Sequence, residues 1–307
     1  MTNHPNDDRD TIAILGLGKV GSAVGHLLKS AGYRIVAVAD QSPAALKKGI
    51  SYTGGKACSS LSEAAMAASC IIITTIDDVI ASVCHEIVLN GAIQKGNKVI
   101  HMSGAGSLDL LAQARQAGAL VASIHPIQSF ADVKGAISNL PGSTFGITAD
   151  NELREWSISL VKALKGTPFF VPEKDKALYH AAACMASNYL TTLMHMVETT
   201  YQALGLSRKE AIRAFWPLVK GTLLNIETRG TIQALTGPIV RGDEGTIEKH
   251  IQALQKSLPD LLNAYCELGL MTVDIALQKD SLTCHQAETI KKRLKGGATN
   301  EHTGNIK

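Results

Sequence analysis

The chain has 307 residues, enough for two domains at the usual ~100–200 residues each. Hydrophobic residues make up 45% and charged residues 19%, the balance of a globular protein and not of a disordered one. A net charge of +3, with no basic run interleaved with aromatics, argues against nucleic acid as a partner. No apolar stretch reaches the ~20 residues that cross a bilayer, so we expect no membrane partner.

The N-terminal segment and the cysteines bear on location. Residues 1–10 are polar and acidic, unlike a signal peptide. The six cysteines form no CxxC pair and no metal-ligand spacing, so we expect no metal site. We therefore expect reduced cysteines, most of them in the core, and a cytoplasmic protein.

Short apolar runs alternate with helical stretches from Thr11 onward. The apolar runs predict strands, and a helix is predicted over 19–31, ending before Gly32. The run 70–74 is typical of a strand buried on both faces of a parallel sheet. We therefore predict the α/β class, with a doubly wound Rossmann sheet in a dinucleotide-binding domain over 11–172. The predicted strands are 11–15, 34–39, 70–74, 98–102 and 120–124.

The pattern becomes helical throughout from Ala177 to about Arg293. A long helix is predicted over 179–204, and Pro217 is expected to kink the next one. This region predicts an all-α domain over 173–295, in which we expect residues that bind the substrate. The segments 1–10 and 296–307 are predicted to be disordered tails.

The first predicted strand-to-helix turn reads Gly16-Leu17-Gly18-Lys19-Val20-Gly21. The glycines permit a tight turn, close approach of a pyrophosphate and close packing of helix on strand. The helix N-terminus then offers free N–H groups and a positive dipole end to phosphates. Asp40 ends the second strand nineteen residues beyond Gly21, near the usual spacing of the ribose-binding acid. The pattern therefore predicts a nicotinamide dinucleotide site.

The choice between NAD and NADP stays open. An Asp40 carboxylate accepts hydrogen bonds from ribose hydroxyls and repels a 2′-phosphate, which favours NAD. Lys47 and Lys48 follow closely and offset that repulsion, which favours NADP.

Polar residues follow the later predicted strands, where ligands bind in such sheets. Thr75, Ser103 and His125 are predicted to contact the cofactor, although each could instead serve a turn or a helix cap.

Three side chains share one stripe of the long predicted helix. His180, Cys184 and Asn188 are four residues apart, which places them on one face. Reduction of a carbonyl needs a proton donor, and a histidine titrates near neutral pH. We therefore predict a catalytic role for all three; the alternative is that this alanine-rich helix simply packs closely against a neighbour.

A Gly- and Pro-rich loop at 234–243 is the second candidate site. Arg241 is a candidate partner for a substrate carboxylate, or else a structural partner of Asp243. Asn225 and Thr236 are predicted to join it in substrate binding.

Four strings of the sequence are distinctive: YHAAACMASN at 179–188, ALTGPIVRGD at 234–243, MSG at 102–104 and IHPIQ at 124–128. Together they resemble an uncharacterised oxidoreductase family in which a Rossmann-like domain precedes a C-terminal domain of unknown function. The resemblance covers about residues 11–270 and implies kinship with ketopantoate, pyrroline-5-carboxylate and 6-phosphogluconate-like dehydrogenases. The helical domains of those enzymes often form dimers, so the resemblance implies a homodimer through the domain over 173–295.

Ketopantoate reductases place Lys-xxx-Asn-xxx-Asn along the first long helix of their second domain. By that resemblance His180 takes the place of the lysine as proton donor, Cys184 departs from the pattern, and Asn188 matches. The resemblance implies an NAD(P)H-dependent reductase of a small 2-keto acid, with ketopantoate as the leading substrate. The alternatives are a cyclic-imine reductase and a non-catalytic sensor of nicotinamide dinucleotides.

Overall fold

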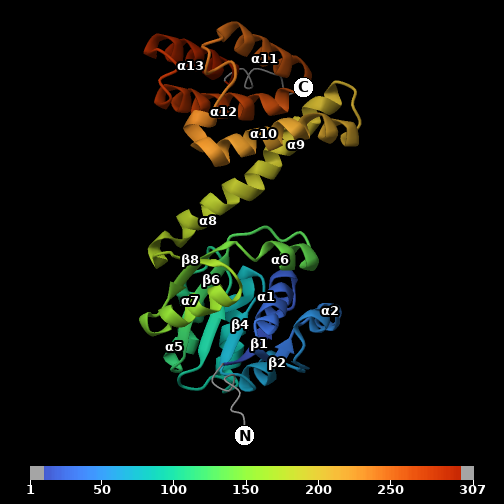
Figure 1. Cartoon of the computed structure of the whole chain (residues 1–307), viewed down its shortest axis with the longest axis vertical. Coiled ribbons are helices and arrows are strands. Elements are labelled where there is room, and N and C mark those ends of the chain that lie inside the picture. Colours follow the sequence, from blue (N-terminus) through green and yellow to red (C-terminus); the bar gives the residue numbers. More distant parts are fainter. Residues whose placement is uncertain (1–9, 299–307) are drawn as a thin grey trace, which may run out of the picture. The chain divides into compact units, whose positions relative to one another are not determined.

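The computed structural model describes residues 10–298, which divide into two compact units between Asn188 and Tyr189 (Figure 1). The first unit is α/β and the second is helical, so the predicted fold class is confirmed. The domain boundary was predicted after residue 172, and the division lies further along the chain. The helix that begins at Lys176 belongs to the first unit, since Lys176 donates a hydrogen bond to Ser123 of the sheet. Asp10 and residues 296–298, predicted as tail, belong to the described structure; the rest of those tails lies outside the described residues.

The described strands of the first unit form one sheet in the order β3-β2-β1-β4-β5-β6-β7-β8. Neighbours are parallel except for β6 and β7, which are antiparallel. The strand order reverses at β1, and a ligand crevice is expected there outside the carboxyl ends of the strands. The strands are β1 (Thr11–Leu15), β2 (Arg34–Ala39), β3 (Lys56–Ala57), β4 (Cys70–Ile73), β5 (Lys98–His101), β6 (Leu120–Pro126), β7 (Thr144–Ala149) and β8 (Thr167–Phe170).

The five predicted strands are confirmed, each with ends within two residues of the prediction. The sequence did not predict β3, β7 and β8, and each lacks a continuous apolar run. β3 has only two residues, β7 contains Gly146, and β8 begins Thr167-Pro168 and is partly exposed. Periodicity alone identifies the strands that are buried on both faces and misses those near the edges of a sheet.

Helices cover both faces of the sheet, as a doubly wound fold requires. Alternate residues of each central strand face opposite sides, so Ile12 and Ile14 pack with α1, α6 and α7, whereas Ala13 and Leu15 pack with α3, α4 and α5. The helices are α1 (Lys19–Ser30), α2 (Pro43–Thr53), α3 (Leu61–Met66), α4 (Ile80–Leu89), α5 (Ala112–Gln116), α6 (Val133–Asn139), α7 (Arg154–Ala163) and α8 (Lys176–Cys184).

The long helix predicted over 179–204 is interrupted. α8 ends at Cys184, a π-helical turn covers Met185–Tyr189, and α9 runs over Leu190–Ala203 before Gly205 turns the chain with φ +93°. Such π-turns are rare and occur often at functional sites. A period of 3.6 residues cannot reveal one extra residue in a single turn.

Up to residue 298, the second unit contains α9 and four further helices. They are α10 (Arg208–Ala234), α11 (Glu244–Ser257), α12 (Pro259–Gln278) and α13 (Cys284–Ala298). In α10 the non-helical dihedrals lie at Gly230 (φ 76°, ψ 164°), and not at the expected kink, Pro217. Ile247, Cys266 and Ile290 form part of a buried core between α11, α12 and α13. None of the helices in residues 10–298 has the length and apolarity to cross a membrane.

Asp10 joins the start of the sheet to two other elements. Its Oδ1 accepts hydrogen bonds from Lys98 Nζ at 2.7 Å and from Ser69 Oγ at 2.9 Å. Its Oδ2 accepts from Trp156 Nε1 at 2.7 Å. Burial raises the pKa of this carboxyl, but the bonds from Lys98, Trp156 and Ser69 outweigh it, and the net pKa is lowered.

We expect Asp10→Asn to lower the free energy of unfolding by about 1.5–3 kcal/mol at neutral pH, the range for hydrogen bonds to a charged group. Because the folded-state pKa is lowered, this stabilisation is present above the unfolded-state pKa and disappears as the pH falls through the folded-state value, below 3.8. Urea titrations followed by Trp156 fluorescence in a Trp216→Phe background measure the difference. The exposed Asp280→Asn serves as control, and equal stability of the two variants at pH 7 would contradict the expectation.

Candidate functional site

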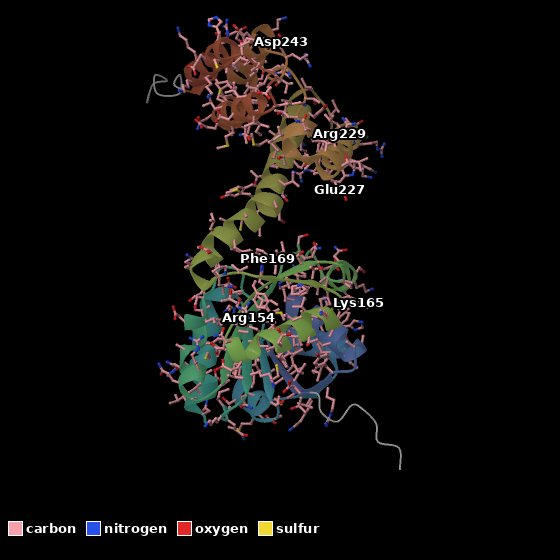
Figure 2. The ribbon with its side chains drawn as sticks, turned by 60° about the vertical axis from the view of Figure 1, so that its left-hand side comes forward. Arg154, Lys165, Phe169, Glu227, Arg229 and Asp243 are labelled. Atoms are coloured by element: carbon pink, nitrogen blue, oxygen red, sulfur yellow. The ribbon has the colours of Figure 1, made fainter. Side chains whose placement is uncertain are left out.

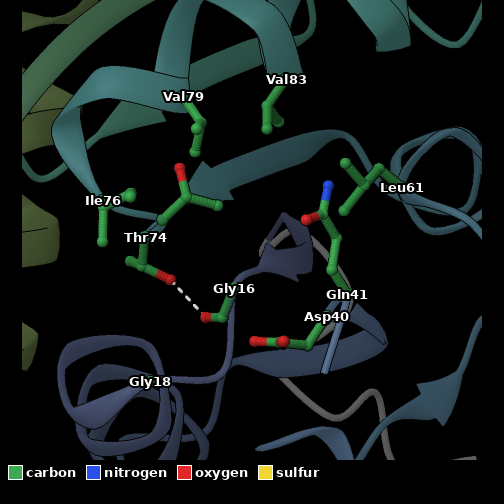
Figure 3. A pocket seen from close by; sticks show the side chains of 10 residues that line it. Gly16, Gly18, Asp40, Gln41, Leu61, Thr74, Ile76, Val79 and Val83 are labelled. Atoms are coloured by element: carbon green, nitrogen blue, oxygen red, sulfur yellow. Dashed lines mark hydrogen bonds between the residues drawn. The ribbon is translucent and has the colours of Figure 1, made fainter. Parts of the chain in front are cut away.

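The turn between β1 and α1 opens onto a pocket of about 280 Å³ at the switch point of the sheet (Figure 3). Its walls come from the carboxyl ends of β1, β2 and β4 and from the starts of α3 and α4. The lining residues are Gly16, Gly18, Asp40, Gln41, Leu61, Thr74, Thr75, Ile76, Val79 and Val83.

The three glycines of the turn differ in what a side chain would meet. A Cβ on Gly16 would lie 2.9 Å from the backbone carbon of Thr74, and Gly16 has φ +100°. A Cβ on Gly21 would lie 2.1 Å from the carbonyl oxygen of Gly16. A Cβ on Gly18 would meet nothing within 4 Å, so the space beside it is open to a ligand. This is the division of roles expected of a pyrophosphate-binding turn.

Asp40 and Thr74 hold the turn in place. The Leu17 N–H donates to Asp40 Oδ2 at 2.6 Å, and the Ser42 N–H donates to Asp40 Oδ1 at 2.7 Å. The Thr74 hydroxyl donates to the Gly16 carbonyl at 2.6 Å, the dashed line of Figure 3. Each carboxylate oxygen has further acceptor capacity, so Asp40 can still receive a hydroxyl from the pocket side.

Thr75 has an unsatisfied hydroxyl at this pocket. Its Oγ1 is buried and has no hydrogen-bond partner among the described residues. A buried polar atom without a partner costs free energy and calls for an explanation, and a bound ligand would supply one. The open space at Gly18 and this hydroxyl both fit a dinucleotide.

The predicted cofactor residues do not all lie at the pocket. Gly16, Gly18, Asp40 and Thr75 line the pocket, and Gln41 adds a lining residue that was not predicted. Leu17 and Val20 pack into the core, and the Lys19 side chain is exposed. Neither Lys47 nor Lys48 belongs to the lining. Ser103 and His125 lie in a different cluster, at the ends of β5 and β6.

This second cluster surrounds two imidazole rings, those of His125 and His180. The ring centroids are 5.8 Å apart at an interplanar angle of 75°. His125 Nδ1 lies 2.8 Å from the hydroxyl oxygen of Tyr179, which precedes His180 in α8. A Cβ on Gly104 would lie 2.4 Å from His180 Cδ2 and 2.9 Å from His125 Nε2. The glycine of the Met102-Ser103-Gly104 string is therefore what lets both rings approach the end of β5.

Lys176 is the functional candidate that the sequence analysis missed. It is 2% exposed, and its ammonium donates to Ser123 Oγ at 2.7 Å and to the Ser103 carbonyl at 3.4 Å. Lysines are almost never fully buried without partners, so a buried lysine at the carboxyl edge of the sheet indicates function. The sequence does contain one indication of Lys176: it lies four residues before His180, so it extends the stripe of His180 and Cys184 by one position.

The cluster shifts the protonation of its members. Burial lowers the pKa of His125 to about 4, with contributions from the charges of His180 and Lys176. Burial, followed by the charge of Lys176, also lowers the pKa of His101 to about 4. Burial lowers the pKa of Lys176 itself to about 8, and raises that of Tyr179 to about 12. At neutral pH the structure thus holds a largely cationic lysine beside two neutral imidazoles.

Ser103 connects the cluster around His125 and His180 to the pocket at the glycine turn. Its hydroxyl donates to Asp77 Oδ2 at 2.6 Å and accepts from the Gly106 N–H at 2.8 Å. Asp77 follows β4, next to the pocket residue Ile76. The structure therefore brings Ser103, His125 and His180 to neighbouring strand ends within the first unit.

The other predicted catalytic residues lie further along the same helical path. Cys184 Sγ is 3.9 Å from His180 Nδ1 and is partly buried. Asn188 is exposed and lies in the π-helical turn, so the simple four-residue stripe does not extend to it. Their roles stay predictions. The described residues contain no cluster of metal-ligating side chains.

The predicted substrate residues Asn225, Thr236 and Arg241 all belong to the second unit. Arg241 is exposed and 4.0 Å from Asp243 Oδ2, at the limit of an ion pair. Asp243, labelled in Figure 2, instead caps α11, because its carboxylate accepts from the Thr246 N–H and hydroxyl at 3.1 and 2.7 Å. The role of the three residues in binding a carboxylate stays a prediction.

Comparison with known domains gives two matches. A Rossmann-like domain is matched at residues 3–126, and a domain of unknown function (DUF2520) at residues 143–272. The chain therefore carries a Rossmann-like domain followed by this C-terminal domain, and the predicted pairing is confirmed. No curated protein matches the sequence.

Solved structures share the fold. A candidate NADP oxidoreductase from Bacteroides fragilis has a TM-score of 0.69 at 17% identity, covering 92% of this chain and 98% of that chain. A protein from Thermotoga maritima has a TM-score of 0.70 at 23% identity, covering 87% and 99%. A pyrroline carboxylate reductase from Plasmodium falciparum, solved with NADP bound, has a TM-score of 0.55 at 14% identity, covering 92% and 98%. At these identities the similarity establishes the fold.

We expect Lys176→Met to raise the pKa of both His101 and His125 toward the ordinary value of 6.5, because a nearby cation no longer opposes their protonation. Histidine NMR titrations of the full chain measure both. Lys174→Met, two residues away and exposed, is the matched control and should leave both pKa values unchanged. If Lys176→Met also left them unchanged, its ammonium would not be the charge that acts on these rings.

Proposed function

We propose that this chain is an NAD(P)-dependent oxidoreductase that reduces the carbonyl group of a small 2-keto acid. One observation carries the proposal: a glycine turn with open space at Gly18 and a cluster of shielded imidazoles occupy neighbouring strand ends of one sheet. Ligands of doubly wound sheets bind at this edge. The shared fold with the Bacteroides and Plasmodium proteins supports the same class.

Residues 16–21 and the N-terminus of α1 would hold the pyrophosphate through backbone N–H groups. Asp40 would accept from the adenosine ribose, and the unsatisfied Thr75 hydroxyl would receive a partner. When bound, the dinucleotide supplies a hydride. Asp40 and Gln41 in the lining favour NAD, whereas the NADP named for two structural neighbours favours NADP, so the proposal covers both.

His180 is proposed to supply the proton. When a hydride adds to the carbonyl carbon, the C=O π electrons move to the oxygen, which must gain a proton to become a hydroxyl. The His180 imidazole lies at the strand ends beside Gly104 and is followed along the helical path by Cys184 and Asn188. We keep ketopantoate as the first substrate to test.

A cyclic imine is the second candidate substrate, favoured by the fold shared with the Plasmodium pyrroline carboxylate reductase. Its C=N group needs the same hydride and proton, so the cluster does not distinguish it from a ketone. A third possibility, a non-catalytic dinucleotide sensor, would need the pocket but not the imidazoles.

A homodimer is part of the proposal. Large apolar side chains are exposed on α9, α10 and α12 of the second unit, and a partner subunit that covered them would remove apolar surface from water. They are Leu193, Trp216, Leu218, Leu223, Leu224, Leu268 and Met271. A cytoplasmic location is also proposed, because the described cysteines are free thiols and most are buried.

The deciding experiment measures oxidation of NADH and NADPH by the purified chain with ketopantoate, with pyrroline-5-carboxylate and with neither. Oxidation that depends on ketopantoate supports the lead proposal and identifies the cofactor. Oxidation that depends only on the imine transfers the proposal to the second candidate. Dinucleotide binding without turnover on either substrate or on a wider panel of keto acids and imines contradicts the enzyme proposal and favours the sensor.

We expect Gly18→Ala to weaken NAD(P)H binding by about tenfold or more, since overpacking a filled site costs about 1–3 kcal/mol. The apo fold should be unaffected, because Gly18 has φ −69° and its Cβ position is open. Fluorescence titration gives Kd and thermal unfolding gives Tm. Gly221→Ala, also in open space, is the control and should leave Kd unchanged. Equal Kd values for the two variants would place the dinucleotide elsewhere.

We expect His180→Ala to lower kcat by about 10²–10⁴-fold, the usual contribution of a general acid, with Kd for the dinucleotide unchanged. Steady-state kinetics and binding titrations separate the two quantities. His195→Ala, on α9, is the matched histidine control. Full turnover of the His180 variant would remove it from the proton pathway.

A further inference from the structure

Tyr179 and His125 form a pair that the proton chemistry above does not use. Tyr179 comes from α8 and His125 from the end of β6; their rings are 5.6 Å apart and nearly perpendicular, at 89°. The Tyr179 hydroxyl oxygen lies 2.8 Å from His125 Nδ1. Among the described residues the structure gives Nδ1 this partner and gives Nε2 none.

Gly146 makes room for the Tyr179 hydroxyl. It pairs with His125 across β6 and β7, and a Cβ on it would lie 2.3 Å from the hydroxyl oxygen. Any other residue at this position would push the phenol away from His125. Gly146 therefore lets the phenol oxygen lie beside Nδ1 of His125.

The pair therefore has a preferred direction. A neutral imidazole has one N–H donor and one acceptor nitrogen, and the hydrogen bond at one nitrogen determines the tautomer. A phenol is a strong donor and a weak acceptor, so Tyr179 donates to Nδ1 and the proton of His125 resides on Nε2. Nε2 lies on the side of Gly104, where the His180 ring also lies.

We propose that Tyr179 is a positioning residue that fixes His125 as the Nε2–H tautomer. We further propose that this N–H donates a hydrogen bond to the substrate oxygen or nitrogen on which negative charge develops when hydride adds to the carbon. The inference rests on the proposed function and adds a second group to it. His125 keeps its proton and stabilises the developing negative charge on oxygen or nitrogen, while His180 gives up the proton that completes the product. Electrons and protons balance as before: one hydride on carbon, one proton on the heteroatom.

The electrostatics agree with this division of roles. His125 has a pKa of about 4, owing to burial and then to the charges of His180 and Lys176, so it is neutral at pH 7. A neutral imidazole is a poor proton source but a good fixed hydrogen-bond donor, and a donor that needs no reorganisation stabilises charge effectively.

The tautomer can be measured directly in the full chain labelled with ¹⁵N-histidine. Two-bond ¹H–¹⁵N spectra distinguish the tautomers, and the spectrum of His125→Gln assigns the signals. We expect the Nε2–H form in the wild type and a displaced Nδ1 signal in Tyr179→Phe, which lacks only the hydroxyl. An Nδ1–H tautomer, or an Nδ1 signal indifferent to Tyr179→Phe, overturns the proposal.

Matched substitutions test the donor. The amide nitrogen of glutamine can occupy the place of Nε2, whereas that of asparagine reaches only the place of Nδ1. We expect His125→Asn to lower kcat by about 10²–10³-fold, the loss typical of one such donor, and His125→Gln to retain much more. Kd for the dinucleotide should be unchanged in both. Equal losses in kcat, or weakened dinucleotide binding with kcat retained, overturn the proposal.

A binding readout separates this inference from the proposed function. We expect the His125 Nε2–H signal to shift when the 2-hydroxy acid pantoate is added to the dinucleotide complex, and not when dinucleotide is added alone. A shift with dinucleotide alone makes His125 a cofactor ligand and overturns the inference, whether or not turnover is found. Absence of turnover together with the Nε2–H tautomer and a pantoate-dependent shift contradicts only the proposed reaction.

Discussion

The absence of a Cβ at Gly16 and Gly21 is the constraint on which the rest of the first unit depends. With 2.1 Å between the Gly16 carbonyl and the Cβ position of Gly21, any side chain there would separate α1 from the end of β1. The Thr74 hydroxyl closes the same contact by donating to that carbonyl, so β4 is joined to the turn as well. The backbones of α1, β1 and the end of β4 thus lie in close contact, and the pocket lies beside this contact.

A second constraint is electrostatic and lies two strands further along the sheet. Burying Lys176 is costly, and among the described residues the cost is offset by hydrogen bonds to Ser123 Oγ and the Ser103 carbonyl and by the negative charges of Glu173 and Asp77. The gain is that a positive charge stands beside imidazoles that have lost most of their water. It acts together with burial to keep His101 and His125 neutral. Strongly shifted pKa values cluster at functional sites, which supports the role proposed for these residues.

The sequence predicted the turn well because its constraint is local: three glycines, one strand and one helix within about thirty residues determine it. Lys176 could not be found the same way. A lysine on a helix is exposed by default, and only the packing of α8 on β5 and β6 shows that this one is not. The same holds for Gly146, whose importance comes from a tyrosine 33 residues later in the chain. The π-helical turn escaped for a different reason, since one extra residue leaves the apolar pattern nearly intact.

Glycine is the element common to both clusters, and it explains how one sheet edge accommodates two kinds of chemistry. At Gly18 the missing side chain leaves space for a ligand, whereas at Gly104 and Gly146 it leaves space for the protein's own aromatic groups. In the first case the backbone N–H groups of the turn are the proposed binding surface. In the second the backbone becomes a flat support, on which Tyr179, His125 and His180 take fixed orientations. Orientation decides what an imidazole can do, because a ring free to rotate offers donor and acceptor equally. Positions without side chains thereby determine what the neighbouring side chains do.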